Sequence, residues 1–247
     1  MDKIIGSNIE RIREIGSTNN YAAQQLLTKS LIEGMVFIAD SQVEGRGQVL
    51  TKWESEPNKN LTFSILLYPD FLEINKQFEL SKAISLGVCD FLKDIMGNTS
   101  IKWPNDIYIG KGKVAGILIE NSVRINKISS SIVGIGLNVN QQFFTGDAPN
   151  PVSLSQITGK VYDLEESLYR LCLKIDARYH QLRSGEFGKI DYDYTDLLYQ
   201  QGYWSNYSYE NGDFEGKILG VDFIGRLMVE TRTGKIKKFN YKEIVFK

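Results

Sequence analysis

Two lysines and one aspartate stand close together around a proline near the middle of the chain. Lys102, Asp106 and Lys113 surround a turn that Pro104 constrains. Lysine neutralises phosphate oxygens, and a carboxylate holds a metal ion or orients a substrate, so this set suits a magnesium nucleotide. A solvated hairpin with a surface ion pair fits the same residues, and the stretch alone leaves both interpretations open.

A glycine-containing segment earlier in the chain offers another cation. Gly45 and Gly47 flank Arg46, and glycine lets a backbone approach a ligand closely. The guanidinium of arginine is planar and always charged, which suits a carboxylate or a phosphate. No Gly-Lys-Ser/Thr sequence follows, so the segment is not a Walker phosphate loop. On its own it also fits a flexible surface loop.

Two further polar segments adjoin apolar stretches. A serine–threonine–asparagine sequence that begins at Ser17 precedes good helix formers, so Ser17 could simply cap a helix. Gly134 and Gly136 lie inside an apolar run that ends at Asn138. Glycines within a strand indicate close approach of a ligand or of another backbone, or else a β-bulge.

The elements that must position these residues follow from apolar patterning and turn residues. We expect a helix after 17–20, a helical stretch within 71–96 and helices at 162–182 and 191–200; strands at 35–40, 60–68 and 129–139; a hairpin of 106–109 with 114–120; and loops at 40–53 and 140–153. After Gln201 the sequence changes to short strands and turns. The order indicates an α+β fold with domains at 1–200 and 201–247.

Composition excludes several functions. The 247 residues carry 29 Lys and Arg against 30 Asp and Glu, a net charge of −1, unlike the basic domain of a nucleic-acid binder. Cys89 and Cys172 stand in apolar stretches and are expected to be buried free thiols. One histidine, His180, makes a zinc site or a Ser-His-Asp triad improbable. With neither a membrane span nor a signal peptide in the sequence, a cytoplasmic location is expected.

The order of the polar segments resembles the biotin protein ligases. The resemblance rests on STN from Ser17, on Gln42 with Gly45-Arg46-Gly47, on KWPND at 102–106 followed by KVAGIL at 113–118, and on GIGLNVN at 134–140. It implies a class II synthetase-like catalytic domain followed by a small SH3-like β-barrel. It also implies that biotin and Mg·ATP form biotinoyl-5′-AMP, from which biotin passes to a lysine of a biotin carboxyl carrier protein.

The resemblance assigns roles to matched residues. Lys113 would contact the biotin carboxylate and the α-phosphate, and Asp106 would position magnesium or substrate; with Arg46, these are the expected catalytic residues. The residues expected at biotin are Ser17, Thr18, Asn19, Gln42, Gly45, Arg46, Gly47, Gln48, Lys113, Gly116 and Gly134; those at the nucleotide are Lys102, Asn105 and Asn138. Amides and hydroxyls suit a ureido ring, which both donates and accepts hydrogen bonds.

The chain departs from the family pattern at two positions. Gln48 stands where many members have a second arginine, and Thr51 where they have another basic residue. We hypothesise that Gln48 either replaces the arginine through its amide or leaves the adenylate less tightly held. Phe143 and Phe144, in the loop after Asn138, could form an apolar lid over the adenylate, or could be two partly buried loop aromatics.

Three other functions stay open from the sequence. A lipoate–protein ligase would perform the same adenylation on a different acid, a non-catalytic biotin sensor would only bind, and a nucleotide-binding protein could serve an unrelated purpose. Only 16 residues precede Ser17, so the helix-turn-helix domain of some family members has no room, and we expect neither a repressor role nor DNA binding. A homodimer is possible, because the family includes monomers and dimers.

Overall fold

A mixed seven-stranded sheet forms the larger part of the protein. The computed structural model describes residues 2–48, 51–146, 148–210 and 212–247. In spatial order the strands are β1 (Ile9–Ile15), β2 (Val36–Gln42), β3 (Leu61–Leu67), β7 (Lys127–Leu137), β6 (Gly112–Arg124), β5 (Asp106–Ile109) and β4 (Thr99–Lys102). Only the β1–β2 pair is parallel; the others are antiparallel.

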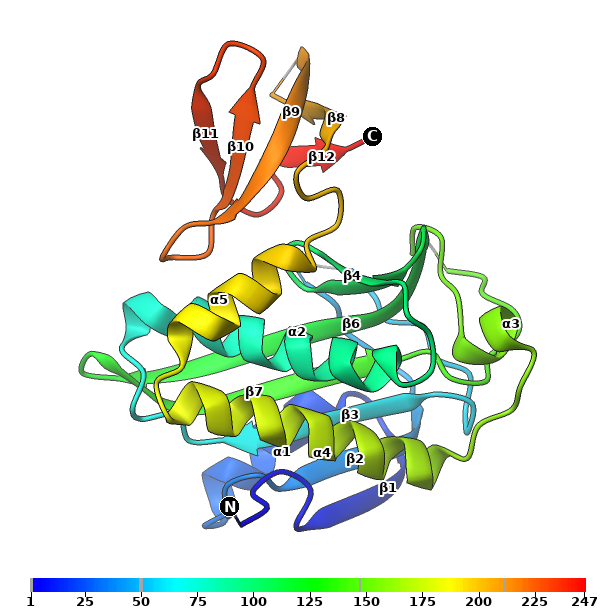
Figure 1. Ribbon diagram of the computed structural model, residues 1–247. Coiled ribbons are helices and arrows are strands. Elements are labelled where there is room, and N and C mark those ends of the chain that lie inside the picture. Colours follow the sequence, from blue (N-terminus) through cyan, green and yellow to red (C-terminus); the bar gives the residue numbers. More distant parts are fainter. Residues whose placement is uncertain (1, 49–50, 147, 211) are drawn as a thin grey trace.

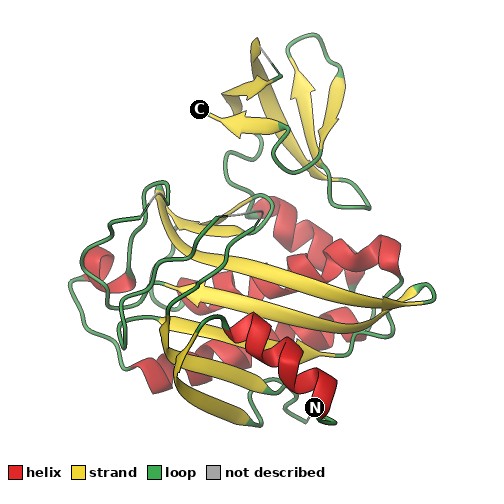
Figure 2. Cartoon of the chain, turned by 180° about the vertical axis from the view of Figure 1, so that it is seen from behind, coloured by secondary structure: helices red, strands yellow, loops and turns green. Residues whose placement is uncertain are grey.

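Helices cover the two faces of this sheet unequally (Figures 1 and 2). The long helices α2 (Gln77–Lys93) and α4 (Leu164–Arg183), with α5 (Phe187–Asp196), lie on one face; α1 (Thr18–Thr28) lies on the other beside long loops. The short elements are η1 (Ile74–Lys76) and α3 (Leu154–Thr158). We call the face that carries α1 the site face. Strand β3 is buried along its whole length, because other elements cover both faces of the sheet there.

A small antiparallel sheet stands above the large one in Figure 1. Its spatial order is β11 (Ile236–Phe239), β10 (Leu227–Thr231), β9 (Gly212–Val221), β8 (Trp204–Tyr209) and β12 (Ile244–Phe246). The indole N–H of Trp103 ties the two parts together by donating to the carbonyl of Gly225 at 2.9 Å. The expected α+β fold, with a mixed sheet, helices and a small β module, is confirmed; the pairings of the described residues leave β11 and β12 at opposite ends and do not by themselves close a barrel.

Four elements differ from the expectation, one of them strand β4, where no strand was expected. The segment of β1 was not expected as a strand, because its isoleucines recur at every third residue rather than every second. Helix α3 was missed as well, although Ser153 and Gln156 form a capping box at its start. The last helix spans 187–196 rather than 191–200, because the backbone beyond it pairs with Ile101 of β4 instead of continuing the helix.

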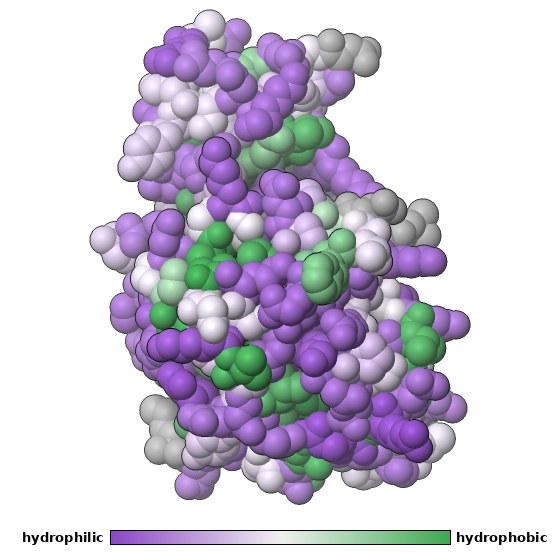
Figure 3. Space-filling view, turned by 90° about the vertical axis from the view of Figure 1, so that its right-hand side faces the viewer, coloured by the Kyte–Doolittle hydropathy of each residue, from purple (hydrophilic) through white to green (hydrophobic). Residues whose placement is uncertain are grey.

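The surface and the thiols agree with a globular chain. Cys89 and Cys172 are free and buried, as expected. Figure 3, which faces the side of α3, shows a mostly hydrophilic surface on which hydrophobic residues form separate patches. No helix among the described residues is long and apolar enough to span a membrane.

Candidate active site

Five directly paired residues on neighbouring strands form a row across the site face, and the two ends of this row differ chemically. Its members are Thr62 on β3, Gly136 on β7, Gly116 on β6, Asp106 on β5 and Lys102 on β4. Directly paired residues project toward the same face of a sheet, so this row has a charged end, a bare glycine centre and a hydroxyl end. The sequence separates Thr62 from Gly136 widely, and only the strand order brings them together.

A β-bulge brings Lys113 to the same face. The pairing of β5 with β6 shifts register at Val114, the extra residue. In a regular strand side chains alternate, so Lys113 would point away from the face of Gly116. The extra residue reverses the alternation and sets Lys113 opposite Tyr108, beside Asp106. Its Nζ lies 2.7 Å from Asp106 Oδ1, and the two side chains are 15% and 22% exposed.

Lys102 is held by aromatic rings rather than by a carboxylate. Its Nζ lies 5.3 Å from the ring centre of Tyr108 and 5.1 Å from that of Phe246, on β12 of the small sheet. Burial lowers the pKa of Lys102, against the opposing attraction of Asp106. The small sheet therefore supplies one wall of the charged end of the site.

Hydroxyls and amides form a buried cluster next to the glycine centre. Ser64 Oγ donates to Thr18 Oγ1 at 2.8 Å and to Asn19 Oδ1 at 2.6 Å. The backbone N–H and the hydroxyl of Thr18 both donate to Gln42 Oε1. Ser17 is the N-cap residue of α1, but its hydroxyl makes no capping bond. The polar ends of α1 and β2 are thus brought to one point on the sheet.

Glu120 joins this cluster to Arg46. Its carboxylate accepts from Asn19 Nδ2 at 2.7 Å and from Arg46 Nη2 at 3.0 Å. Gly134 lies directly below, and a Cβ atom there would stand 2.4 Å from Asn19 Oδ1. Glycine at 134 is therefore required for the amide of Asn19 to lie flat on the sheet. The expected catalytic role of Arg46 stays a prediction.

The indole of Trp53 covers the glycine centre. A Cβ atom would lie 2.2 Å from the indole at Gly136 and 2.9 Å from it at Gly116. The ring also lies under Lys113, whose Nζ is 5.7 Å from its centroid. The indole nitrogen is buried without a hydrogen-bond partner. A ligand that follows the row must therefore share this space with the ring or displace it.

A short hairpin carries Trp53. The Trp53 N–H donates to the carbonyl of Gly45, and the Gly47 N–H donates to that of Thr51. Both glycines are tightly enclosed, since a Cβ would lie 2.2 Å from the Trp53 carbonyl oxygen at Gly45 and 2.3 Å from Thr51 Oγ1 at Gly47. Gly45 and Gly47 were expected to let a ligand approach. In this structure their lack of a side chain lets the two segments of the hairpin pack together.

The two asparagines expected at the nucleotide have different surroundings. Asn105 clamps β6, because its backbone and amide groups exchange hydrogen bonds with those of Ile117. Asn138 is 2% exposed; its Nδ2 donates to Val152, while its Oδ1 is buried without a partner. An unsatisfied buried oxygen is costly, so Asn138 is the better candidate for contact with a ligand donor.

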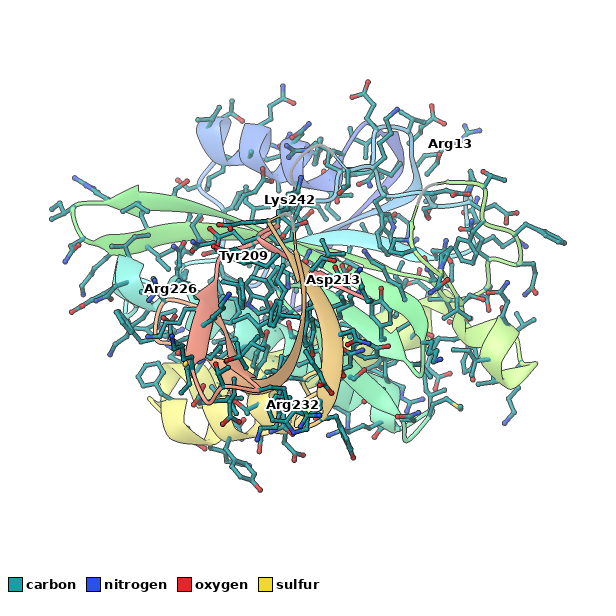
Figure 4. The ribbon with its side chains drawn as sticks, turned by 90° about the horizontal axis from the view of Figure 1, so that it is seen from above. Arg13, Tyr209, Asp213, Arg226, Arg232 and Lys242 are labelled. Atoms are coloured by element: carbon teal, nitrogen blue, oxygen red, sulfur yellow. The ribbon has the colours of Figure 1, made fainter. Side chains whose placement is uncertain are left out.

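Gln48 lines a cavity of about 470 Å³ beside the row rather than over it. Trp103, Asn105, Phe78 and Arg226 line the same cavity, which therefore lies between β6, α2 and the small sheet. Figure 4, viewed from above, shows Arg226 on the side of the small sheet nearest the start of α2. The hairpin carrying Arg46 thus reaches from the hydroxyl cluster to the junction of the two sheets.

Sequence reasoning missed three participants. Ser64 is a polar residue in a strand that is buried along its whole length, and a polar residue inside such a run was a usable signal. Glu120 stands two residues after KVAGIL, and Trp53 six residues after Gly47, but the resemblance assigns a role to neither. Of the two aromatics proposed as a lid, Phe143 is 83% exposed and Phe144 half-buried.

The charged end suits a metal only together with a nucleotide. The described residues contain no group of three or more His, Cys, Asp or Glu that could hold a metal ion. Asp106 offers one carboxylate, already paired with Lys113. Magnesium commonly binds through one or two carboxylates plus substrate phosphates. The donor set therefore fits magnesium that arrives as Mg·ATP.

The arrangement offers hydrogen-bonding groups at one end and positive charge at the other. Comparison with known proteins gives the family of the chain. Residues 2–138 match the Biotin/lipoate A/B protein ligase family, and residues 207–247 match the Biotin protein ligase C terminal domain. The chain belongs to the biotin/lipoate A/B protein ligase family.

Individual relatives agree. The chain is 33% identical over 237 residues to the bifunctional ligase/repressor BirA of Bacillus subtilis, covering 94% of this chain and 72% of that protein. It is 28% identical over 192 residues to the biotin–acetyl-CoA-carboxylase ligase of Mycobacterium tuberculosis, covering 74% and 70%. The solved biotin protein ligase of Aquifex aeolicus in complex with biotin and ATP superposes with a TM-score of 0.80 at 29% identity, covering 98% and 99% of the two chains.

Proposed function

We infer that this protein is an ATP-dependent biotin ligase, which joins biotin to a lysine of a biotin carboxyl carrier protein through biotinoyl-5′-AMP. The observation that carries this is the row on the site face, where a hydroxyl and amide cluster meets the Lys113–Asp106 pair across two glycines. Family membership and the likeness to a ligase solved with biotin and ATP support it.

In the first step, a carboxylate oxygen of biotin attacks the α-phosphorus of ATP. A new P–O bond forms at the α-phosphorus. The bond between the α-phosphorus and the oxygen that bridges it to the β-phosphate breaks, and pyrophosphate leaves. Both reactants are anions, so we propose that the ammonium group of Lys113 offsets their repulsion and the charge that develops at the α-phosphate. Asp106 holds that ammonium in place through its 2.7 Å contact, and Lys102 attracts the remaining phosphates.

In the second step, the amine of the acceptor lysine attacks the biotinyl carbonyl carbon. An amide bond forms, the bond to AMP breaks, and the amine loses a proton. We propose that the acceptor is a biotin carboxyl carrier protein, that the protein acts in the cytoplasm and that it uses Mg²⁺. We also propose the site residues assigned above and a domain boundary at Gln200. Magnesium would be bound by ATP phosphates and by Asp106, and would neutralise phosphate charge.

The hydroxyl and amide cluster favours biotin over lipoate. The ureido ring of biotin both donates and accepts hydrogen bonds, as do Thr18, Asn19, Gln42 and Ser64. The dithiolane ring of lipoate has no such groups, so its binding would leave buried polar atoms unsatisfied. A ligase and a sensor would share this cluster, and a measurement of adenylate formation separates them.

Pyrophosphate–ATP exchange without an acceptor tests this function directly. The purified protein with Mg²⁺ should exchange label only when biotin is present. Exchange with lipoate alone would instead identify a lipoate ligase. Biotin binding without exchange in a folded protein would identify a sensor, and dependence on neither acid would identify an unrelated nucleotide-binding protein.

The aromatic wall around Lys102 gives one prediction. Phe246→Ala should weaken ATP binding by about tenfold, the upper range expected for a partly buried cation–π contact, and should leave biotin affinity unchanged. Calorimetric titration with each ligand checks this. Val245→Ala, next to it but 58% exposed, is the control; an equal loss for both ligands would show that the small sheet merely stabilises the whole site.

Gln48 gives a second prediction. Gln48→Arg should slow the dissociation of biotinoyl-5′-AMP by about tenfold, because a guanidinium adds a cation at the junction where phosphate charge is expected. The off-rate is measured by chasing labelled adenylate with unlabelled compound. Equal rates in the wild type and Gln48→Arg would mean that the glutamine amide already meets the need, or that position 48 does not contact the adenylate.

A further inference from the structure

One carboxylate joins two loops that lie far apart in the sequence. Glu54 follows Trp53 directly, and its Oε1 accepts from the backbone N–H of Thr145 at 3.0 Å. Its Oε2 accepts from the N–H of Gly146 at 2.5 Å. The hydroxyl of Thr145 adds a bond at 3.2 Å, and the amide of Gln141 one at 3.4 Å.

These bonds favour the ionised carboxylate. Burial alone would raise the pKa of Glu54, but the N–H donors of Thr145 and Gly146 and the side chains of Thr145 and Gln141 outweigh it and hold the pKa below its usual value. Hydrogen bonds to an ionised acceptor are roughly twice as strong as neutral ones. The contact is therefore substantial, although both loops are partly exposed.

The contact is anchored on both sides. On one side, the neighbouring residue Trp53 lies over Gly116 and Gly136 at the centre of the site. On the other, Gln141 is 1% exposed, and its Oε1 accepts from Asn60 Nδ2 and from the Glu56 N–H. Glu54 thus ties the segment that covers the site to the start of the 140–153 loop.

We propose that Glu54 is a positioning residue that latches the Trp53 hairpin to the 141–146 loop, so that both cover the activated acid as one unit. This rests on the proposed biotin ligase function. Glu54 takes no part in the chemistry of adenylation. Its effect is on how long biotinoyl-5′-AMP stays shielded before the acceptor lysine arrives.

Shielding matters because water competes with the lysine. Water attacks the same carbonyl carbon, breaks the same bond to AMP, and yields biotin and AMP without product. Closed loops limit this side reaction and also retain the intermediate. A lost latch should therefore raise wasteful turnover without slowing the formation of the intermediate.

A burst experiment separates the rate at which biotinoyl-5′-AMP forms from the rate at which it is lost. Enzyme, biotin and Mg·ATP are mixed without acceptor, and pyrophosphate release is followed. The burst reports formation of biotinoyl-5′-AMP, and the slow linear phase reports its loss. Glu54→Ala should raise the linear rate by about tenfold and change the burst rate less than about twofold.

Matched variants test whether the latch is responsible. Glu56→Gln is the control, since among the described residues no hydrogen bond or ion pair involves the exposed Glu56 carboxylate. Glu54→Gln keeps one acceptor oxygen and should give an intermediate linear rate. Gly146→Pro removes a donor from the opposite loop and should match Glu54→Ala. Hydrogen exchange without substrates should show that Glu54→Ala exposes the amides of Thr145 and Gly146.

The outcomes are distinct. A wild-type protein that forms no burst with biotin overturns the proposed function. A normal burst with the same linear rate in wild type and Glu54→Ala overturns the latch and leaves the ligase function intact. Unchanged protection of the Thr145 and Gly146 amides in Glu54→Ala would also overturn it.

Discussion

Replacing Lys113 by alanine is expected to lower biotin-dependent pyrophosphate–ATP exchange by about a thousandfold, the upper range for losing one preorganised electrostatic contact. ATP affinity should fall by less than about tenfold, because Lys102 remains and ground-state binding is shared among several contacts. The difference would show that the ammonium acts mainly on the developing charge. Exchange kinetics and calorimetric ATP titration measure the two quantities.

The control for this substitution lies two residues away. Lys111 is exposed in the turn between β5 and β6, so Lys111→Ala removes the same charge from the same hairpin without touching the site. It should retain full exchange. If Lys113→Ala lost ATP affinity and exchange in equal proportion, Lys113 would be a binding residue only.

Gly134→Ala is expected to raise the dissociation constant of biotin by about a hundredfold. The added methyl group would stand 2.4 Å from Asn19 Oδ1 and force that side chain off the sheet. Asn19 would then lose its contacts with Ser64 and Glu120. Two displaced buried hydrogen bonds at about 1–2 kcal/mol each correspond to this change. Equilibrium binding of labelled biotin measures it.

Gly188→Ala is the matched control. Gly188 lies in α5, where an added Cβ meets nothing within 4 Å, so this variant should keep biotin affinity and melt at the same or a slightly higher temperature. A folded Gly134→Ala protein with unchanged biotin affinity would show that Asn19 does not contact biotin.

The sequence predicts the central elements because their patterns are local. The run at 60–68 is mostly apolar, and the run at 129–139 has an apolar second half; most of both lies in strands. Helix α4 has Asp163 as its cap and a periodic buried face. By contrast, the paired contacts of β1 are parallel and distant in sequence, and no nearby turn signals them.

The sequence motifs point to several residues of the candidate site, but not to Ser64 and not to the geometry of the site. Motif order gathers Lys113, Asp106 and Asn19 into one expected site, and the structure places them on one face. The hydrogen bond between Thr145 and Glu54 joins residues 91 positions apart, and neither segment has a sequence pattern that indicates it. Nor does KVAGIL indicate a bulge, since Val114 is an ordinary apolar strand residue followed by another apolar residue.

That bulge decides on which face of the sheet the ammonium group of Lys113 lies. In strand β6 the alternation of side chains between the two faces is interrupted at Val114. Lys113 lies before this interruption and Gly116 after it. If β6 paired with β5 without this bulge, its intact sequence would place Lys113 on the opposite face from Gly116, toward the layer of long helices. A redesign that keeps the sequence of β6 must therefore keep this bulge, because it places Lys113 and Gly116 on one face of the sheet.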